Sequence, residues 1–415
     1  MMVLNRWGKR GGISLVDQAI HGGTNFLINI ILARWLSPNE YGAFAVAYTI
    51  FLLIGAIHTS VMIEPMMVYG AKKYLETFRG YIGSLLLGHG VFSVLVSFIL
   101  IVSSLTFLAF DSKELADAFL GLAIASPFIL LQWMIRRSFY VVSQSTWALA
   151  GSFMYFTLNA LMIFLLFQKA SLTPYWAFLS MGLIGLLVSV CQLRILKPEF
   201  KWTGPLSLYS IFHDHKEFGA WNIVGTVIKW ASTGILTIMV SAFLGLKAAG
   251  VLSVVRTLFR PLDLMLNAVS LVALPVLSSV QGEHASIERR KKMRDLLWLV
   301  CGTVTLYGIL LSSFSEFILH YLYKGIYDGH RHLFVLISLS FVASSFVFVY
   351  TLGLKSIGVT REIAKIWSTS AIVVFVGSIP MINAWGIPGA LTVQIFSICI
   401  AGYLAWLAVR QKILA

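Results

Sequence analysis

Residues 80–108 decide the fold, because the stretch GYIGSLLLGHGVFSVLVSFILIVSSLTFL contains no Asp, Glu, Lys or Arg. A helix of this length rises about 1.5 Å per residue and exceeds the roughly 30 Å hydrocarbon core of a bilayer, so the stretch predicts a transmembrane helix. The whole chain has the same character: 58% of its 415 residues are hydrophobic and 12% are charged. Soluble domains carry about 25% charged residues. The composition therefore excludes a soluble globular fold.

The rest of the chain divides into similar apolar stretches, separated by short polar segments. Each is about as long as a membrane crossing requires, roughly 20 residues. We therefore expect an all-α polytopic membrane protein with twelve transmembrane helices. Besides residues 80–108, the expected spans are 13–35, 41–64, 116–140, 145–167, 174–195, 217–243, 248–277, 296–322, 332–354, 363–383 and 386–409.

The distribution of Lys and Arg predicts the orientation, because cytoplasmic loops are enriched in these residues. With twelve spans, both termini fall on one side of the membrane. When cations near the ends of spans are counted with the adjoining loops, that side holds 22 of the 31 Lys and Arg residues, the other side holds six, and three lie deep inside spans. We therefore expect both termini in the cytoplasm. The net charge of +14 is a topology signal, and it does not indicate nucleic-acid binding.

A shift of 208 residues aligns the first half of the chain with the second, although so few identities among apolar residues could also arise by chance. Six spans in each half, starting from the same side, indicate a parallel repeat. Secondary transporters built in this way hold their substrate near the midplane, between the halves. We therefore expect two six-helix lobes, residues 1–200 and 201–415. The aligned identities are Leu36 with Leu244, Gly42 with Gly250, Thr49 with Thr257, and Phe51 with Phe259.

Three cations fall inside expected spans. Lys229, Arg256 and Arg260 lie about 12–18 Å from the ends of their helices at 1.5 Å per residue, near the bilayer midplane. A charge at this depth is costly and needs a partner or a water-filled cavity. Two structural interpretations stay open: Arg260 can pair with Asp263, and Lys229 can extend its amine toward the interface.

The first expected span carries a stripe of polar residues. Asp17, His21, Asn25 and Asn29 recur every four residues and so share one helix face. That face is expected to be wet or buried in protein. Asp17 lies near the start of the span, where the helix dipole alone would favour a carboxylate. The 208-residue shift places His21 opposite Lys229.

The second and third spans add His58 and His89, and Glu64 precedes Pro65 at the inner end of the second span. Histidines in such positions are more often packed between helices than used as ligands or proton carriers. Both interpretations stay open for His58 and His89. We expect Glu64 to face the membrane interface.

Other motifs narrow the mechanism. The chain has no G-x-x-x-x-G-K-[ST] phosphate loop, so direct use of ATP is not supported. Its cysteines, Cys191, Cys301 and Cys399, are far apart inside apolar segments and predict neither a disulfide nor a metal site. We expect no cofactor and no metal, and any energy would come from a gradient of H⁺ or Na⁺.

The N-terminal region resembles a known family. Residues 14–53, SLVDQAIHGGTNFLINIILARWLSPNEYGAFAVAYTIFLL, together with Ile63-Glu64-Pro65, are similar to the opening of the Wzx-type polysaccharide flippases. These are the O-antigen and exopolysaccharide branch of the MOP superfamily, which also contains multidrug and lipid II exporters. The pieces D-Q, N-F, A-R-x-L and Y-G-x-F carry the resemblance.

The resemblance implies two lobes around a central cavity in the bacterial cytoplasmic (inner) membrane. It implies a flippase for lipopolysaccharide or exopolysaccharide synthesis, which moves a polyprenyl-diphosphate-linked oligosaccharide of the undecaprenyl type from the inner to the outer leaflet. Membrane lipids and other polysaccharide assembly proteins are the expected partners. The chain would then be a secondary transporter and not an enzyme.

The residues and the resemblance agree on the chemistry. Arginine binds phosphate through two hydrogen bonds, so the cations suit a diphosphate, and the polar stripe suits sugar hydroxyls. A second group is expected to line the cavity or couple transport to an ion. The predicted substrate-binding residues are Arg256, Arg260, Lys229, His21 and Asn25, and the predicted coupling or cavity-lining residues are Asp17, Asp263, His58 and Glu64.

Two alternatives stay open. One is a multidrug exporter of the same superfamily, although cationic drugs favour an acidic midplane and this midplane is basic. The other is a membrane-embedded glycan polymerase or ligase. The sequence leaves the glycan, the coupling ion, the resting conformation and the oligomeric state undetermined.

Overall fold

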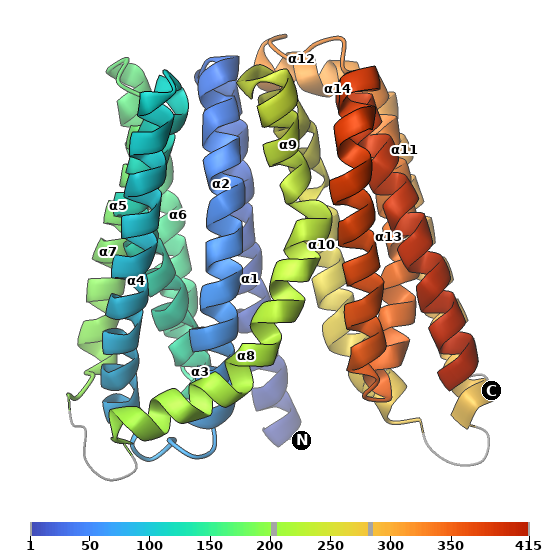
Figure 1. The fold of residues 1–415 in the computed structure, drawn as a ribbon. Helices are drawn as coiled ribbons and strands as arrows, with labels where there is room; N and C mark the ends of the chain where they lie inside the picture. Colours follow the sequence, from blue (N-terminus) through green and yellow to red (C-terminus); the bar gives the residue numbers. More distant parts are fainter. Residues whose placement is uncertain (1, 201–205, 281–284, 414–415) are drawn as a thin grey trace. The chain divides into compact units, whose positions relative to one another are not determined.

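A computed structural model describes residues 2–200, 206–280 and 285–413. Within these ranges the regular structure is entirely helical, and the expected all-α class is confirmed (Figure 1). The chain forms two compact units, Met1–Val227 and Ile228–Ala415. The expected lobe boundary at residue 201 lies outside the described residues, and the two-lobe arrangement around a cavity stays a prediction.

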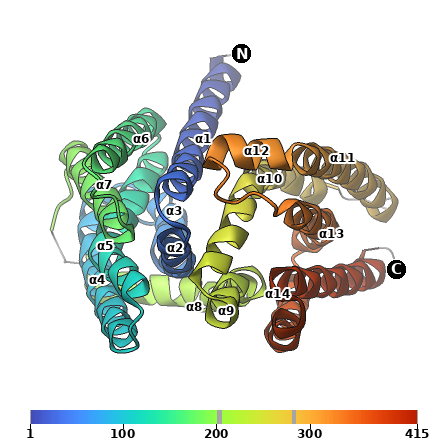
Figure 2. The same cartoon turned by 90° about the horizontal axis from the view of Figure 1, so that it is seen from above.

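Unit 1 is organised around one central helix, α5, which contacts α2, α4, α6 and α7 (Figure 2). The first part of α8 also belongs to this unit. The elements of unit 1 are α1 (Met2–Trp35), α2 (Pro38–His58), the π-helix η1 (Thr59–Ile63), α3 (Glu64–Gly70), α4 (Phe78–Ala109), α5 (Lys113–Val141), α6 (Ser145–Gln168), α7 (Pro174–Leu196) and α8 (Leu208–Thr233).

Local sequence explains where these helices begin. Ser37 and Glu40 form a capping box before α2, with each side chain bonded to the other residue's backbone N–H, which satisfies donors that a helix start leaves free. Thr173 caps α7, and Pro38 and Pro174 occupy first helical positions. Within the unit, Gly182 lets α7 approach α5 closely, because a Cβ at this position would lie 2.6 Å from the Cα of Ala125.

Unit 2 has α13 at its centre, in contact with α10, α11 and α14. Its elements, after the last residues of α8, are α9 (Ile235–Leu244), α10 (Leu246–Ser278), α11 (Ala285–Ser313), α12 (Ser315–Tyr323), α13 (Arg331–Ser356) and α14 (Thr360–Lys412).

The 53 residues of α14 are two helices joined at Gly386, whose backbone is not helical (φ 61°, ψ −138°). At about 1.5 Å per residue this run is more than twice the thickness of a bilayer's hydrocarbon core. The kink falls at the first residue of the expected span 386–409, just after the expected span 363–383. Glycine suits it because a positive φ is strained for residues with a Cβ.

The expected span 217–243 is broken, which corrects the prediction of one continuous helix. The segments Asn222–Thr233 and Ile235–Leu244 meet at an angle of 42°. The break falls at Gly234, where an added Cβ would lie 2.5 Å from Nε1 of Trp230. Broken helices leave backbone carbonyls without helical partners, and transporters use such ends to hold ligands.

Nine helices in the described ranges are long and apolar enough to cross a membrane, or ten if the bent α8–α9 pair is one span. The helix α1 is not among them, and α14 is counted once although it bends at Gly386. The chain is thus a multi-pass membrane protein. The count of twelve spans stays a prediction.

Candidate functional site

The cations predicted at the midplane form one electrostatic cluster in unit 2. Lys229 lies on α8, and Arg256 and Arg260 lie on α10 with Asp263. The charges of all three cations act on Asp263, that of Arg260 most strongly. The side chains of Lys229 and Asp263 are exposed, and those of both arginines are half-buried. The structure therefore brings these four predicted residues together.

Arg256 is fixed by three hydrogen bonds to neutral groups. Its Nη1 donates to the carbonyl of Thr233 (3.3 Å) and the hydroxyl of Thr237 (3.2 Å). Its Nη2 donates to Oε1 of Gln394 on α14 (2.7 Å). The Thr233 carbonyl lies directly before the break at Gly234, so Arg256 satisfies a carbonyl at the end of α8 and also holds the start of α9. This structural task was not evident from the sequence.

The same bonds orient Arg256 without neutralising it. A guanidinium has five N–H donors, and the three bonds to Thr233, Thr237 and Gln394 leave two of them for a further acceptor. Because these partners are a carbonyl, a hydroxyl and an amide, the positive charge is positioned but not cancelled. Such an arginine is suited to bind an anion.

The sequence did not predict one member of the cluster, Lys355. It lies in the last turn of α13, is exposed, and its charge acts on Lys229. Because Lys355 directly follows the apolar stretch 332–354, its position in the sequence is that of a loop residue. With Lys355, the cluster has four cations and a single carboxylate, that of Asp263. Its electrostatic field favours an anion.

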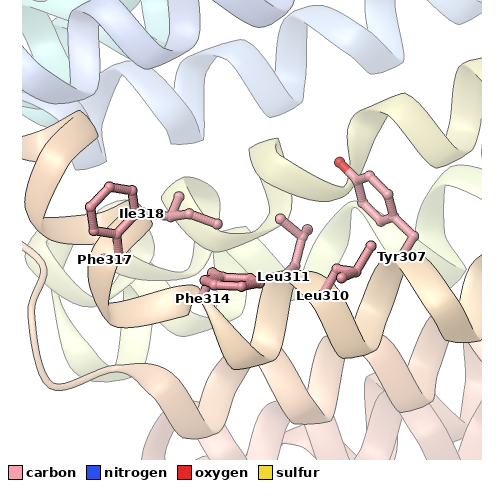
Figure 3. Close-up of a pocket in the computed structure, with 6 residues that line it drawn as sticks. All are labelled: Tyr307, Leu310, Leu311, Phe314, Phe317 and Ile318. Atoms are coloured by element: carbon pink, nitrogen blue, oxygen red, sulfur yellow. The ribbon is translucent and has the colours of Figure 1, made fainter.

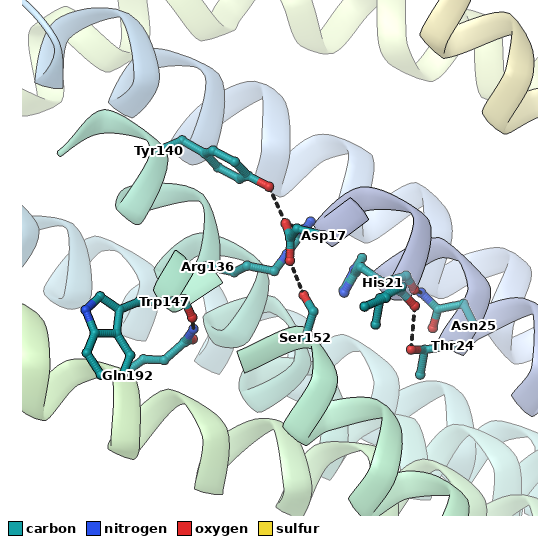
Figure 4. Close-up of polar contacts among 10 residues, drawn as sticks. Asp17, His21, Thr24, Asn25, Arg136, Tyr140, Trp147, Ser152 and Gln192 are labelled. Carbon is teal, nitrogen blue, oxygen red and sulfur yellow. Dashed lines mark hydrogen bonds and ion pairs between the residues drawn. The ribbon is translucent and has the colours of Figure 1, made fainter. Parts of the chain in front are cut away.

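In unit 1, Asp17 is the centre of a buried polar network (Figure 4). Its Oδ2 accepts hydrogen bonds from Arg136 Nη1 (2.6 Å) and from the Tyr140 hydroxyl. Its Oδ1 accepts a bond from Ser152 (2.5 Å). The carboxylate is fully buried, and the Arg136 side chain is 4% exposed. The network ties α1 to α5 and α6.

This arrangement corrects one expectation. Asp17 is not near a helix terminus, because α1 begins at Met2, and the helix dipole therefore does not explain its position. Its partner Arg136 lies inside α5, which continues to Val141. The buried ion pair explains why a carboxylate is tolerated inside an apolar helix.

His21 and Asn25 lie further along the same helix and are half-buried. The His21 ring packs against Trp133 and Tyr155, with centroids 6.1 and 6.3 Å away, and its Nδ1 has no hydrogen-bond partner among the described residues. Asn25 Nδ2 donates to the His21 carbonyl (3.3 Å). Their predicted contact with sugar hydroxyls stays a prediction.

His58 and Glu64 lie at the two ends of the π-helix η1. His58 is fully buried and contacts His89. Glu64 is exposed and accepts a hydrogen bond from Asn222 of α8 (2.9 Å). Within the described part of the chain, no group of three or more His, Cys, Asp or Glu could hold a metal ion.

The first part of α8 is attached to unit 1 by polar contacts. Asp214 accepts hydrogen bonds from Lys73 and Tyr74, each 2.7 Å long. Burial raises the pKa of Asp214, but these hydrogen bonds outweigh burial, and the pKa is lowered overall. His215 accepts a bond from the Tyr81 hydroxyl (2.6 Å) and donates from Nδ1 to the Val61 carbonyl (2.8 Å).

An apolar cavity of about 320 Å³ lies on α11 and α12, where six side chains gather on one face (Figure 3). It is lined by Tyr307, Leu310, Leu311, Phe314, Phe317 and Ile318. None of these side chains is charged, whereas the cation cluster lies on α8, α10 and α13. We therefore place the candidate site at the cluster and not in this cavity.

Comparison with known structures identifies the fold. The chain is similar to an inward-facing multidrug resistance MATE family transporter of the MOP superfamily, with 12% identity, a TM-score of 0.75, and coverage of 97% of this chain and 98% of that one. It is similar to the lipid II flippase MurJ in an inward closed conformation, with 14% identity, a TM-score of 0.73, and coverage of 95% and 87%.

A third similar structure is a MOP superfamily transporter from Pyrococcus furiosus, for which reverse polarity of the binding pocket suggests a different function. It shares 12% identity over 97% of this chain and 94% of that one, with a TM-score of 0.64.

No curated protein matches the chain in sequence. The sequence profile of one family, described as polysaccharide biosynthesis protein, matches residues 31–323. Because this match covers more than half of the chain, the protein belongs to the polysaccharide biosynthesis protein family, and its fold is that of the MOP superfamily transporters.

Proposed function

We propose that this protein is a flippase that moves polyprenyl-diphosphate-linked oligosaccharides from the inner to the outer leaflet of the bacterial cytoplasmic membrane. The observation that carries the proposal is the cluster of four cations and one carboxylate in unit 2. A diphosphate brings about two negative charges, which such a cluster can bind. Family membership places the chain in polysaccharide biosynthesis.

Each residue has a distinct part in the proposal. Arg256 binds a phosphate oxygen through the two donors that its protein contacts leave, and its position is fixed before the substrate arrives. Arg260 and Lys229 add positive charge. Asp263 prevents the cluster from holding the diphosphate too tightly for release, because its carboxylate repels phosphate.

Transport is proposed to occur by alternating access, with lobe 1–200 rocking against lobe 201–415 around a central cavity. His21 and Asn25 are proposed to bind the glycan. Asp17, His58 and Glu64 are proposed to line the cavity or to couple movement to a gradient of H⁺ or Na⁺.

The charge of the cluster opposes the first alternative, a multidrug exporter. Cationic drugs would be repelled by four cations facing one carboxylate. The inward-facing MATE transporter of the same fold is only 12% identical to this chain, so its substrates do not transfer to it.

A reconstituted transport assay tests the proposal. Purified protein is placed in proteoliposomes with a fluorescent polyprenyl-diphosphate oligosaccharide, and transfer between leaflets is followed. Arg256→Ala is expected to abolish transfer, because the oriented phosphate donors are lost. Arg290→Ala is the matched control, because Arg290 is an exposed cation near the start of α11, and it should transfer at the wild-type rate.

Because Arg256 also holds the break between α8 and α9, each variant must first show wild-type insertion and thermal stability. Arg260→Ala, one helical turn further along α10, should weaken substrate affinity in the same assay. Unchanged transfer by both Arg256→Ala and Arg260→Ala would overturn the assignment. Joining of the glycans without transfer would instead establish the polymerase or ligase alternative.

A further inference from the structure

Two buried histidines in unit 1 form a hydrogen-bonded pair that the proposed substrate site does not use. His58, the last residue of α2, is fully buried, and His89 on α4 is 6% exposed. Nε2 of His58 lies 3.1 Å from Nδ1 of His89. The pair continues to α5, because Nε2 of His89 lies 3.0 Å from the carbonyl of Pro127.

The carbonyl at one end of this chain fixes the positions of the protons. A carbonyl oxygen only accepts, so Nε2 of His89 carries a hydrogen and donates it to Pro127. Nδ1 of a neutral His89 then has a free lone pair, and Nε2 of His58 must donate to it. In a neutral His58 the other nitrogen, Nδ1, is therefore without a hydrogen.

This nitrogen is the point where the pair can take up a proton. Nδ1 of His58 is buried and has no hydrogen-bond partner among the described residues. Among the described residues, the groups in contact with the pair are the Phe92 ring of α4, 5.2 Å from the His58 ring, the Ser93 hydroxyl, 3.2 Å from Nε2 of His89, and the Pro127 carbonyl. None of these is titratable, and the charge that acts on His58 is that of His89.

The pair accommodates one added proton and not two. When His58 takes a proton at Nδ1, its Nε2–H can stay in the bond to His89 or pass along it to His89 Nδ1. A second proton would place hydrogens on both facing nitrogens at a separation of 3.1 Å, and the bond would break. The two rings therefore titrate as one unit with a single exchangeable proton.

The pair also lies next to an irregular part of the helix. His58 directly precedes the π-helix Thr59–Ile63, and π-helical turns are frequent at functional sites. This turn holds α8: Ser60 bonds to Thr226 (3.0 Å), and the Val61 carbonyl accepts from His215 (2.8 Å). A change of charge at His58 thus acts on the segment on which α8 is anchored.

We propose that the His58–His89 pair is the site where this protein binds the proton that drives transport. One proton adds to Nδ1 of His58 from the side of higher proton concentration and leaves by the reverse step on the other side. No covalent bond other than N–H changes. The driving role rests on the proposed flippase function, whereas proton binding at the pair does not.

Proton binding is tested directly on the full chain in lipid nanodiscs. Nitrogen NMR of ¹⁵N-histidine-labelled protein distinguishes bare from protonated ring nitrogens. A bare, buried nitrogen should gain a proton on acidification in the wild type. This signal should vanish in His58→Gln, whose amide N–H can still donate to His89. It should persist in His332→Gln, a control at an exposed histidine of α13. A signal that never titrates, or that remains in His58→Gln, overturns the proposal.

The driving role is tested in proteoliposomes that contain the labelled lipid-diphosphate oligosaccharide. A pH gradient should accelerate transfer by the wild type and by His332→Gln. The same gradient should not accelerate transfer by His58→Gln, and acceleration of that variant would overturn the coupling role. If the rate of wild-type transfer does not depend on the pH gradient, the coupling role is overturned and the flippase assignment stays intact. A wild type that transfers nothing overturns the flippase assignment, and the NMR measurement then decides the proton site alone.

Discussion

At the residue scale, the buried pair of Asp17 and Arg136 shows how this membrane protein tolerates charge. Removing one partner of a buried ion pair leaves the other charge uncompensated, which costs about 3–5 kcal/mol. Asp17 has two further donors, Tyr140 and Ser152, so its carboxylate is fully satisfied. The pair therefore stabilises the packing of α1 on α5 only while both charges are present.

We predict that Asp17→Ala destabilises unit 1 strongly, by about 3–5 kcal/mol. The double variant Asp17→Leu with Arg136→Met should be considerably more stable than Asp17→Ala, because it leaves no charge unpaired. Thermal unfolding in detergent, followed by circular dichroism of the helical signal, measures the stability of both variants. Equal stability of the two variants would mean that the pair is not the source of the effect.

At the element scale, the docking of the first part of α8 on the rest of unit 1 depends on a neutral His215. Burial lowers the pKa of His215, and the hydrogen bond to Val61 and the charge of Asp214 only partly offset this. An unfolded histidine has a pKa of about 6.5. Because the docked form resists protonation, the docking of α8 is fully stable above that pH and weakens as the pH falls below it. Protonation at Nε2 would also remove the acceptor of the Tyr81 hydroxyl.

This predicts a pH-dependent loosening of the first part of α8. Hydrogen exchange of residues 208–220, corrected for the intrinsic effect of pH, should rise on acidification through about pH 6. Exchange in α6 should stay constant. Replacing the exposed neighbour, as in His213→Gln, should leave the effect in place, whereas a pH dependence that survives His215→Gln would exclude His215 as its cause.

The break between α8 and α9 also depends on contacts between elements. Gly234 lies against the Trp230 indole, and the Thr233 carbonyl before it is bonded to Arg256. Glycine in a sequence often marks the end or the interruption of a helix. Its role here depends on a side chain one turn earlier and on an arginine from another helix, so the apolar stretch 217–243 alone predicted a continuous span.

At the scale of the whole molecule, the distribution of Lys and Arg gives a testable topology. In a variant whose Cys191, Cys301 and Cys399 are replaced by serine, a cysteine at His332 should react with a membrane-impermeant thiol reagent added to intact cells. A cysteine at Arg290 should react only after the membrane is opened. Both side chains are exposed. The reverse pattern would contradict cytoplasmic termini.

The sequence by itself determined the class of the protein. Apolar stretches of membrane-spanning length predicted an all-α membrane protein, the N-terminal pieces predicted the family, and the depth of three cations singled out Lys229, Arg256 and Arg260 as predicted substrate-binding residues. These features are local, because hydropathy and helix periodicity act over a few turns of one helix. They could be predicted without knowing which helices are neighbours.

Only the tertiary structure decided which side chains are partners. Arg136 contacts Asp17 across 119 positions of sequence, Arg256 contacts Gln394 across 138, and His58 contacts His89 across 31. Lys355 joined the cation cluster for the same reason. Such contacts depend on helix packing, which hydropathy does not encode, because every apolar helix face is an acceptable neighbour for another or for lipid. Polar partners inside the membrane are therefore fixed by the fold, while the need for them is already visible in the sequence.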